Sequence, residues 1–238
     1  MVNSARIACW SLIDLAVHPE WQEKCKKEIQ GVISRHLGDA GSYPTTSDKF
    51  AALPFEVWED ELPVLEACIR ESHRLAFTGT SLRRNVREDM KIGGQNVRRG
   101  DFLAYSAGDA HLNPKYYPDP YKYDPGRWLR PDPVPTASYP FLGWGAGRHP
   151  CTGMKVAKLE MKLIVAVFLT RFKFELVDKS GKAYGSRPMP DRNDIHRVSP
   201  GFGRHVSTLC LSLCRLDLLD HHVTSISRRS PSRWMADR

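Results

Sequence analysis

The residues that decide the fold are Trp144-Gly-Ala-Gly-Arg-His-Pro-Cys-Thr-Gly153, a glycine-rich loop that carries one cysteine, Cys151. The residues after it, 152–171, predict a long helix that is apolar on almost every side and therefore buried. A thiolate just before a helix N-terminus is stabilised by the helix dipole and by free backbone amides. Glycines such as Gly147 and Gly153 let the backbone approach a large flat ligand closely. The alternative, an inert buried cysteine, leaves the clustered glycines without a reason.

A haem iron is a ligand of this kind, because thiolate ligation donates electron density that favours O–O bond cleavage. Two further motifs lie upstream of the loop. Glu71 and Arg74 stand three residues apart in a helix predicted from Leu62 to about Leu75, so they share one face and can pair. Taken alone, such a pair is most often a solvated surface contact. Residues 123–128, Tyr-Asp-Pro-Gly-Arg-Trp, taken alone are a turn.

In this order and at these separations, the three motifs resemble those of the cytochrome P-450 family, the haem-thiolate monooxygenases. Glu71 and Arg74 match the family's E-x-x-R on its K helix, and Arg127 matches the arginine of its meander. Residues 144–153 match the family's F-x-x-G-x-x-x-C-x-G cysteine loop, with Trp144 in place of the phenylalanine. Lone motifs are weak indicators, whereas three in the family's order are specific.

The resemblance covers about residues 3–198. It implies a mainly α-helical fold with small β-sheets, the C-terminal part of the P-450 fold: the end of the I helix, the J and K helices, the meander, the cysteine loop and the L helix. We divide the chain into a truncated haem-thiolate monooxygenase domain, residues 1–200, and an atypical arginine- and serine-rich tail, residues 201–238. The break in composition indicates a frameshift or an unspliced intron. The alternative is a basic tail that binds an acidic partner.

The resemblance also implies roles for individual residues. One cysteine is the axial ligand of the haem iron, two cationic side chains reach the haem propionates, and three buried side chains form a structural triad. Residues 76–82 fall where substrate contacts would lie. The cofactor-binding residues are Cys151 (the iron ligand), His149, Arg84, Trp144, Gly147 and Gly153, and the triad is Glu71, Arg74 and Arg127.

One departure from the family lies near the start of the chain. The first helix, which Pro19 ends, resembles the second half of the family's I helix, whose first half carries an acid–alcohol pair that delivers protons to bound oxygen. Counting back without gaps places Asn3 at the alcohol and Val2 at the acid. The amide of Asn3 could order a water there, although Val2 cannot carry a proton. The alternative is that these two positions carry no function.

The implied activity is oxidation of an apolar organic substrate (a sterol, a lipid or a secondary metabolite) by O2. The implied cofactor is haem b, and NADPH and flavin act only through a partner reductase. Gly-Arg-His-x-Cys, residues 147–151, resembles the sterol-demethylase-like branch. A stripe of Lys155, Lys158 and Lys162 is either a solvated face or the docking site of an acidic flavin-containing reductase. We expect no nucleic-acid partner.

The family domain is about twice as long, and the segments expected before residue 1 include a membrane anchor and the cover of the other haem face. For the full-length form we therefore expect the cytosolic face of the endoplasmic reticulum membrane, with no membrane segment in this chain. An uncovered haem pocket would expose apolar surface and favour aggregation. The alternative function is a non-catalytic truncated fragment that binds haem weakly or not at all.

Composition excludes several other classes of protein. With 41% hydrophobic and 10% aromatic residues, the chain is too apolar to be disordered over most of its length. The longest apolar stretch, residues 163–169, is far shorter than the ~20 residues that a bilayer requires. No secretory signal begins the sequence. The six cysteines lack C-x-x-C pairs and favour a reducing compartment, and the net charge of +8 permits an acidic partner without naming one.

The remaining elements follow from periodicity and turn residues. Glycine and proline mark most of the expected boundaries. We expect the proline-rich segment before the cysteine loop to be an ordered meander without regular structure. The predicted elements are a helix from Pro19 to about His36 closed by Gly38, a loop over 38–61, a hairpin about Gly93-Gly94, a strand over 101–105, the meander over 113–140, and a strand over 172–177.

Overall fold

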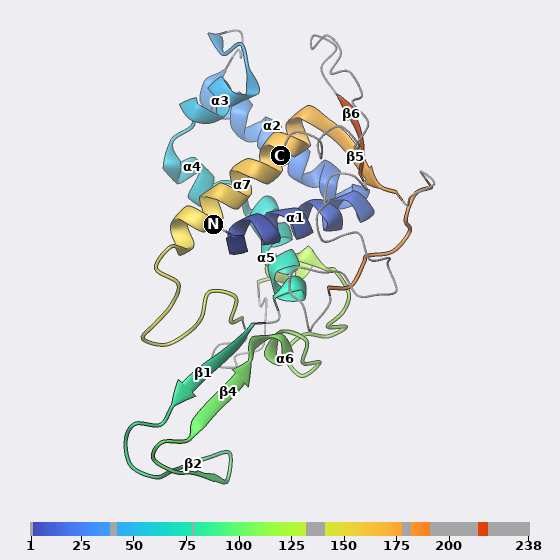
Figure 1. Ribbon diagram of the computed structural model, residues 1–238. Coiled ribbons are helices and arrows are strands. Elements are labelled where there is room, and N and C mark those ends of the chain that lie inside the picture. Colours follow the sequence, from blue (N-terminus) through green and yellow to red (C-terminus); the bar gives the residue numbers. More distant parts are fainter. Residues whose placement is uncertain are drawn as a thin grey trace, which may run out of the picture.

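The computed structural model describes residues 2–38, 42–77, 79–131, 141–177, 182–190 and 214–218. Most of the helices form one body, from which the paired strands β1 and β4 project (Figure 1). The helices are α1 (Val2–Val17), α2 (Pro19–Leu37), α3 (Thr46–Ala52), α4 (Phe55–Asp60), α5 (Pro63–Ala76), α6 (Ala107–His111) and α7 (Met154–Arg171), with the 3₁₀ helix η2 (Pro125–Trp128). The strands are β1 (Thr80–Arg84), β2 (Met90–Ile92), β3 (Gln95–Val97), β4 (Phe102–Ser106), β5 (Phe172–Leu176) and β6 (Cys214–Leu218).

The hydrophobic core lies where α1, α5 and α7 meet. Leu15 of α1, Leu65 of α5 and Val165 of α7 are all fully buried. α1 packs against both other helices, and α2 packs against α5 and α7. Burial of such side chains contributes about 1.5–3 kcal/mol each, which holds α5 in place. The prediction of a mainly helical fold with small sheets is confirmed.

The boundaries of α2 and α5 agree with their sequence signals. Pro19 occupies the first turn of α2, and Gly38 follows it with a positive φ of 58°, as expected for a glycine that ends a helix. α5 begins without a cap from its own chain segment. Instead, the carboxylate of Glu28 on α2 accepts the amide hydrogens of Val64 at 2.8 Å and Leu65 at 2.9 Å. Burial raises the pKa of Glu28.

The prediction of a loop over residues 38–61 is wrong, because α3 and α4 lie within it. Thr45 and Asp48 form a reciprocal capping box that begins α3. Phe50 of α3 and Trp58 of α4 are buried and meet edge to face, with ring centroids 5.1 Å apart. The two helices have seven and six residues, too few for an amphipathic period to stand out among the surrounding turn residues.

Three small antiparallel sheets complete the fold. β1 pairs with β4, and β2 pairs with β3 across the predicted Gly93-Gly94 turn. On the first sheet, Leu82 and Phe102 are 61% and 69% exposed, so this pair of strands presents apolar side chains to solvent. β5 pairs with β6, which is the only described part of residues 201–238.

Helix α7 is buried on one side and not all round, which corrects the prediction for residues 152–171. Met161, Val165 and Leu169 are buried, whereas Val156 is 72% exposed. Lys162, predicted as part of an accessible stripe, is also buried. Within the part of the chain that the structure describes, no helix combines the length and apolarity needed to cross a membrane.

Candidate functional site

The cysteine loop closes on itself and leaves its thiol at the surface. The amide of Cys151 donates to the carbonyl oxygen of Trp144 at 2.7 Å, while the Cys151 side chain is exposed. Gly145 and Gly147 have positive φ values of 75° and 72°, which residues with a side chain rarely adopt. A Cβ at Gly145 would also lie 3.3 Å from the carbonyl oxygen of His149. Glycine is therefore required to form this loop.

The loop leads directly into α7. The amide of Met154, the first residue of α7, donates to the carbonyl oxygen of Cys151 at 3.3 Å. A Cβ added at Gly147 or at Gly153 would meet no protein atom within 4 Å. Around the thiol, the backbone is therefore open to a ligand. An exposed cysteine between such glycines is a donor set that fits the iron of a flat macrocycle.

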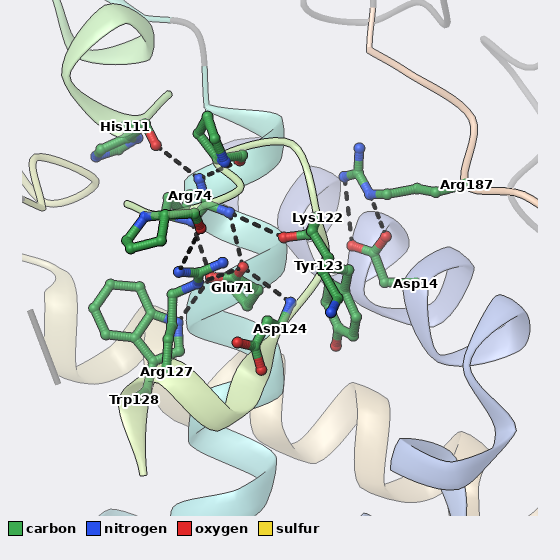
Figure 2. Close-up of polar contacts among 12 residues, drawn as sticks. Asp14, Glu71, Arg74, His111, Lys122, Tyr123, Asp124, Arg127, Trp128 and Arg187 are labelled. Carbon is green, nitrogen blue, oxygen red and sulfur yellow. Dashed lines mark hydrogen bonds and ion pairs between the residues drawn. The ribbon is translucent and has the colours of Figure 1, made fainter. Parts of the chain in front are cut away.

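A buried carboxylate collects the residues of the second and third motifs (Figure 2). Glu71 receives Nε and Nη2 of Arg74 at 2.9 and 2.8 Å, and Nε of Arg127 at 3.0 Å. It also accepts the indole N–H of Trp128 at 2.9 Å and the amide of Asp124 at 3.1 Å. The side chains of Glu71 and Arg74 have no solvent exposure. The structure thus brings Glu71, Arg74 and Arg127 together.

Arg74 also fixes the chain that follows α6. Its Nη1 donates to the carbonyl oxygens of His111 and Pro120, both at 2.7 Å, and its Nη2 donates to that of Lys122 at 3.4 Å. A buried guanidinium is tolerated only when such partners replace water. Because Arg74 lies on α5, this network attaches the meander to the helical core.

Two histidines lie between that network and the cysteine loop. The ring of His73 meets Trp144 edge to face, with centroids 4.9 Å apart. The ring of His111 stacks on Phe141 at 5.0 Å and 15°, and its Nε2 accepts the amide hydrogen of Leu142 at 2.8 Å. Burial lowers the pKa of His73 to about 3 and that of His111 to about 4. Sequence analysis missed both, although His73 stands inside the Glu71–Arg74 motif.

A second buried ion pair lies outside the three motifs. Asp14 of α1 is fully buried and pairs with the guanidinium of Arg187, which also lies over the ring of Trp10 at 4.9 Å (Figure 2). The partners are 173 residues apart, and neither belongs to a local pattern. This pair attaches the segment around Arg187 to α1, beside Tyr123 of the meander.

Three further residues of the predicted site, Arg84, His149 and Asn3, are exposed. Arg84 is exposed on β1, where its Nε donates to the carbonyl oxygen of Gly100 at 3.3 Å and its guanidinium lies 5.7 Å from the Phe102 ring. His149 is exposed two residues before Cys151. Asn3 is exposed in the first turn of α1. Of these three, only His149 belongs to the cysteine loop.

The lysine stripe on α7 is largely committed to contacts within the chain. Lys158 and Lys162 both pair with Glu66, at 2.7 and 3.1 Å. Lys162 is 3% exposed and also donates to the carbonyl oxygen of Trp58 at 2.7 Å. The interpretation of this stripe as a solvated or docking face is therefore wrong for Lys162. Lys155, paired with Glu59 at 3.2 Å, remains 69% exposed.

The part of the chain that holds the three sequence motifs also matches known proteins. The family model described as Cytochrome P450 matches residues 2–188. Cytochrome P450 monooxygenase AacuE of Aspergillus aculeatus is 33% identical over 190 residues, which are 78% of this chain and 37% of that protein. Leukotriene-B4 omega-hydroxylase 3 of Mus musculus is 32% identical over 173 residues, 71% of this chain and 30% of that protein.

Among solved structures, retinoic acid-bound cyanobacterial CYP120A1 superposes with a TM-score of 0.61 at 21% identity. The match covers 74% of this chain and 37% of that one, and it shows that the fold is shared. This chain therefore spans 37% of the length of the first of the two named monooxygenase relatives and 30% of the length of the second.

Proposed function

This chain belongs to the cytochrome P450 family, and on that premise we propose that it acts as a haem-dependent monooxygenase whose iron is held by Cys151. The observation that carries the proposal is that Cys151 is exposed in a glycine-rich loop, which its own amide closes by a hydrogen bond to Trp144. Cys25 and Cys68, in contrast, are fully buried in the helical core. The thiolate form of Cys151 is the donor that haem iron requires.

The other residues of the site fit haem b as the bound group. The exposed guanidinium of Arg84 and the exposed imidazole of His149 can donate hydrogen bonds to the haem propionates. The exposed Leu82 and Phe102 on the same sheet as Arg84 would pack against an apolar macrocycle or its substrate. When bound, thiolate-ligated haem supplies O2 activation and insertion of one oxygen atom into the substrate.

The chain's own contribution is to hold and to position. Cys151 provides the ligand, and the buried contacts of Glu71 with Arg74 and Arg127 keep the meander fixed against α5. Asn3 would order a water that takes part in proton delivery to O2, because its exposed amide can both donate and accept hydrogen bonds.

Electrons come in this proposal from NADPH through a flavin-containing reductase. Lys155, which is exposed at the start of α7, offers a positive charge for an acidic partner.

The substrate is an apolar organic molecule: a sterol, a lipid or a secondary metabolite. A relative named as a leukotriene-B4 hydroxylase and a fold neighbour bound to retinoic acid support this class. The proposed location of the full-length form is the cytosolic face of the endoplasmic reticulum membrane.

A second candidate function is a non-catalytic fragment that binds haem weakly or not at all. It is favoured by the exposed side chains of Leu82, Val86 and Phe102. In this case the apolar side of the β1–β4 sheet would drive self-association.

Titration of the purified full chain with haem separates the two candidates. We expect a Soret absorbance that saturates at one haem per chain, lost in Cys151→Ala and retained in Cys9→Ala, a half-buried cysteine on α1. Sedimentation of the same samples reports association. No saturable binding, or equal binding by the Cys151→Ala protein, would overturn the proposal and leave the fragment candidate.

A further inference from the structure

The main chain and the side chain of His111 contact two different parts of the candidate site. It ends α6 and is fully buried. Its carbonyl oxygen accepts Nη1 of Arg74 at 2.7 Å, and its Nε2 accepts the amide hydrogen of Leu142 at 2.8 Å. The first contact belongs to the buried ion-pair network, and the second belongs to the segment that begins the cysteine loop.

The contact at Leu142 continues to the cysteine. The carbonyl oxygen of Leu142 accepts the amide hydrogen of Gly145 at 3.0 Å, so the peptide groups on both sides of Leu142 are fixed. The next turn is closed by the bond from the Cys151 amide to Trp144 at 2.7 Å. Two consecutive backbone hydrogen bonds therefore separate the imidazole of His111 from the residue that carries the thiol.

The contact with Leu142 determines which ring nitrogen of His111 carries the hydrogen. Nε2 can accept the Leu142 amide only when the ring is neutral and its hydrogen is on Nδ1. In the described part of the chain, Nδ1 is buried and makes no hydrogen bond of normal geometry, although backbone groups of Arg74 and Phe77 lie close to the ring. An unpaired buried N–H is costly. A phenylalanine would stack on Phe141 without that cost, so ring packing alone does not account for a histidine here.

We propose that His111 is a positioning residue that fixes the cysteine loop against the Glu71–Arg74 network through the acceptor at Nε2. This proposal rests on the function proposed above, because the orientation of the Cys151 thiol matters most when it holds iron. Arg74 holds the backbone of His111 and the ring of His111 holds Leu142, so His111 links α5 to the loop by hydrogen bonds, in addition to the ring contact of His73 with Trp144.

The variants His111→Phe and His111→Gln test the acceptor. Phenylalanine keeps the ring and removes the acceptor, whereas the glutamine amide oxygen can replace Nε2. We expect hydrogen exchange at the Leu142 amide to accelerate about tenfold in His111→Phe and to return towards the wild-type rate in His111→Gln. Alkylation of Cys151 should change in His111→Phe and recover in His111→Gln. Unchanged exchange and alkylation in a folded His111→Phe protein would overturn the proposal.

A measurement on the wild-type chain covers the case in which His111→Phe does not fold. Nitrogen NMR at neutral pH should show the His111 ring with its hydrogen on Nδ1. A hydrogen on Nε2 would overturn the proposal, because the Leu142 contact would then be impossible. In the haem-loaded protein, His111→Phe should lower the thiolate-ligated fraction in the CO-difference spectrum. If the wild-type chain binds no haem, the proposed function fails, while the exchange, alkylation and NMR results still decide the role of His111.

Discussion

The indole N–H of Trp128 donates to Oε2 of Glu71 at 2.9 Å, although the two residues are 57 positions apart in the sequence. The same carboxylate also receives two guanidinium groups, from Arg74 and Arg127. The turn formed by η2 is therefore attached to α5 by a neutral donor as well as by charge. The guanidinium of Arg70 lies 4.0 Å over the Trp128 ring and closes the outer side.

Replacing the carboxylate should cost far more than replacing the indole. In Glu71→Ala, the guanidinium groups of Arg74 and Arg127 stay buried without their counter-ion, so we expect a loss of about 3–5 kcal/mol in the free energy of unfolding. Trp128→Phe keeps an aromatic ring under Arg70 and loses one hydrogen bond to a charged group, about 1.5–3 kcal/mol. Urea unfolding of both variants checks this order, and equal losses would contradict it.

The lysines of α7 should differ in their contribution to stability. Lys162→Ala removes an ammonium group that contacts Glu66 and the carbonyl oxygen of Trp58 in the interior, and we expect a loss of about 2 kcal/mol or more. Lys155→Ala removes an exposed pair with Glu59 and should cost less than about 1 kcal/mol. Thermal unfolding at low and high salt measures both. A salt-sensitive loss that is larger in Lys155→Ala would refute this assignment.

Stability should fall on acidification because of two buried histidines. Burial, with Arg74 near His111 and with Arg6 and Lys158 near His73, holds both pKa values far below the ordinary value of 6.5. The unfolded chain therefore takes up protons below about pH 6.5 that the folded chain excludes down to about pH 4. The histidine contribution is full above pH 6.5 and is lost as the pH falls through this window.

Urea unfolding at pH 7.5 and pH 5 measures this loss, which we expect to be a few kcal/mol for the wild-type chain. His111→Gln cannot take up a proton at that position, so its stability should depend less steeply on pH. The same dependence in both proteins would show that His111 is not excluded from protonation in the folded state.

The cysteines should react at very different rates with an alkylating reagent under native conditions. Cys151 is exposed, whereas Cys25 and Cys68 are fully buried with their sulfur atoms 3.5 Å apart. The hydrogen bond to Cys68, together with burial, raises the pKa of the Cys25 thiol well above its usual range. We expect Cys151 to react about a hundredfold faster than either, because the buried thiols react only after local opening. Peptide mass spectrometry identifies each site, and equal rates would contradict the packing of α2 on α5.

Local spacing was sufficient to predict the pairing of Glu71 with Arg74, because residues three apart in a helix share a face. The glycine-rich loop before α7 was also predicted, because its clustered glycines stand out in the sequence. In the structure, two of these glycines have positive φ values. Arg127 entered only through the family pattern. Its partner on α5 lies 56 positions earlier, beyond the reach of any periodicity.

The contacts that sequence analysis missed join segments remote from each other in the chain. Glu28 caps α5 from α2, and Arg187 pairs with Asp14 across the core; nothing local distinguishes these side chains from surface charges. Lys162 resembled its neighbours in the stripe, because only the packing of α4 against α7 brings the Trp58 carbonyl oxygen to it.

The CO-difference spectrum of the reduced, haem-loaded full chain tests the central claim most directly. If Cys151 is the iron ligand, the spectrum will show the strongly red-shifted Soret band of thiolate-ligated haem. The band will vanish in Cys151→Ala and persist in Cys9→Ala. A chain that binds haem without this band, or a Cys151→Ala protein that keeps it, would contradict the assignment of Cys151.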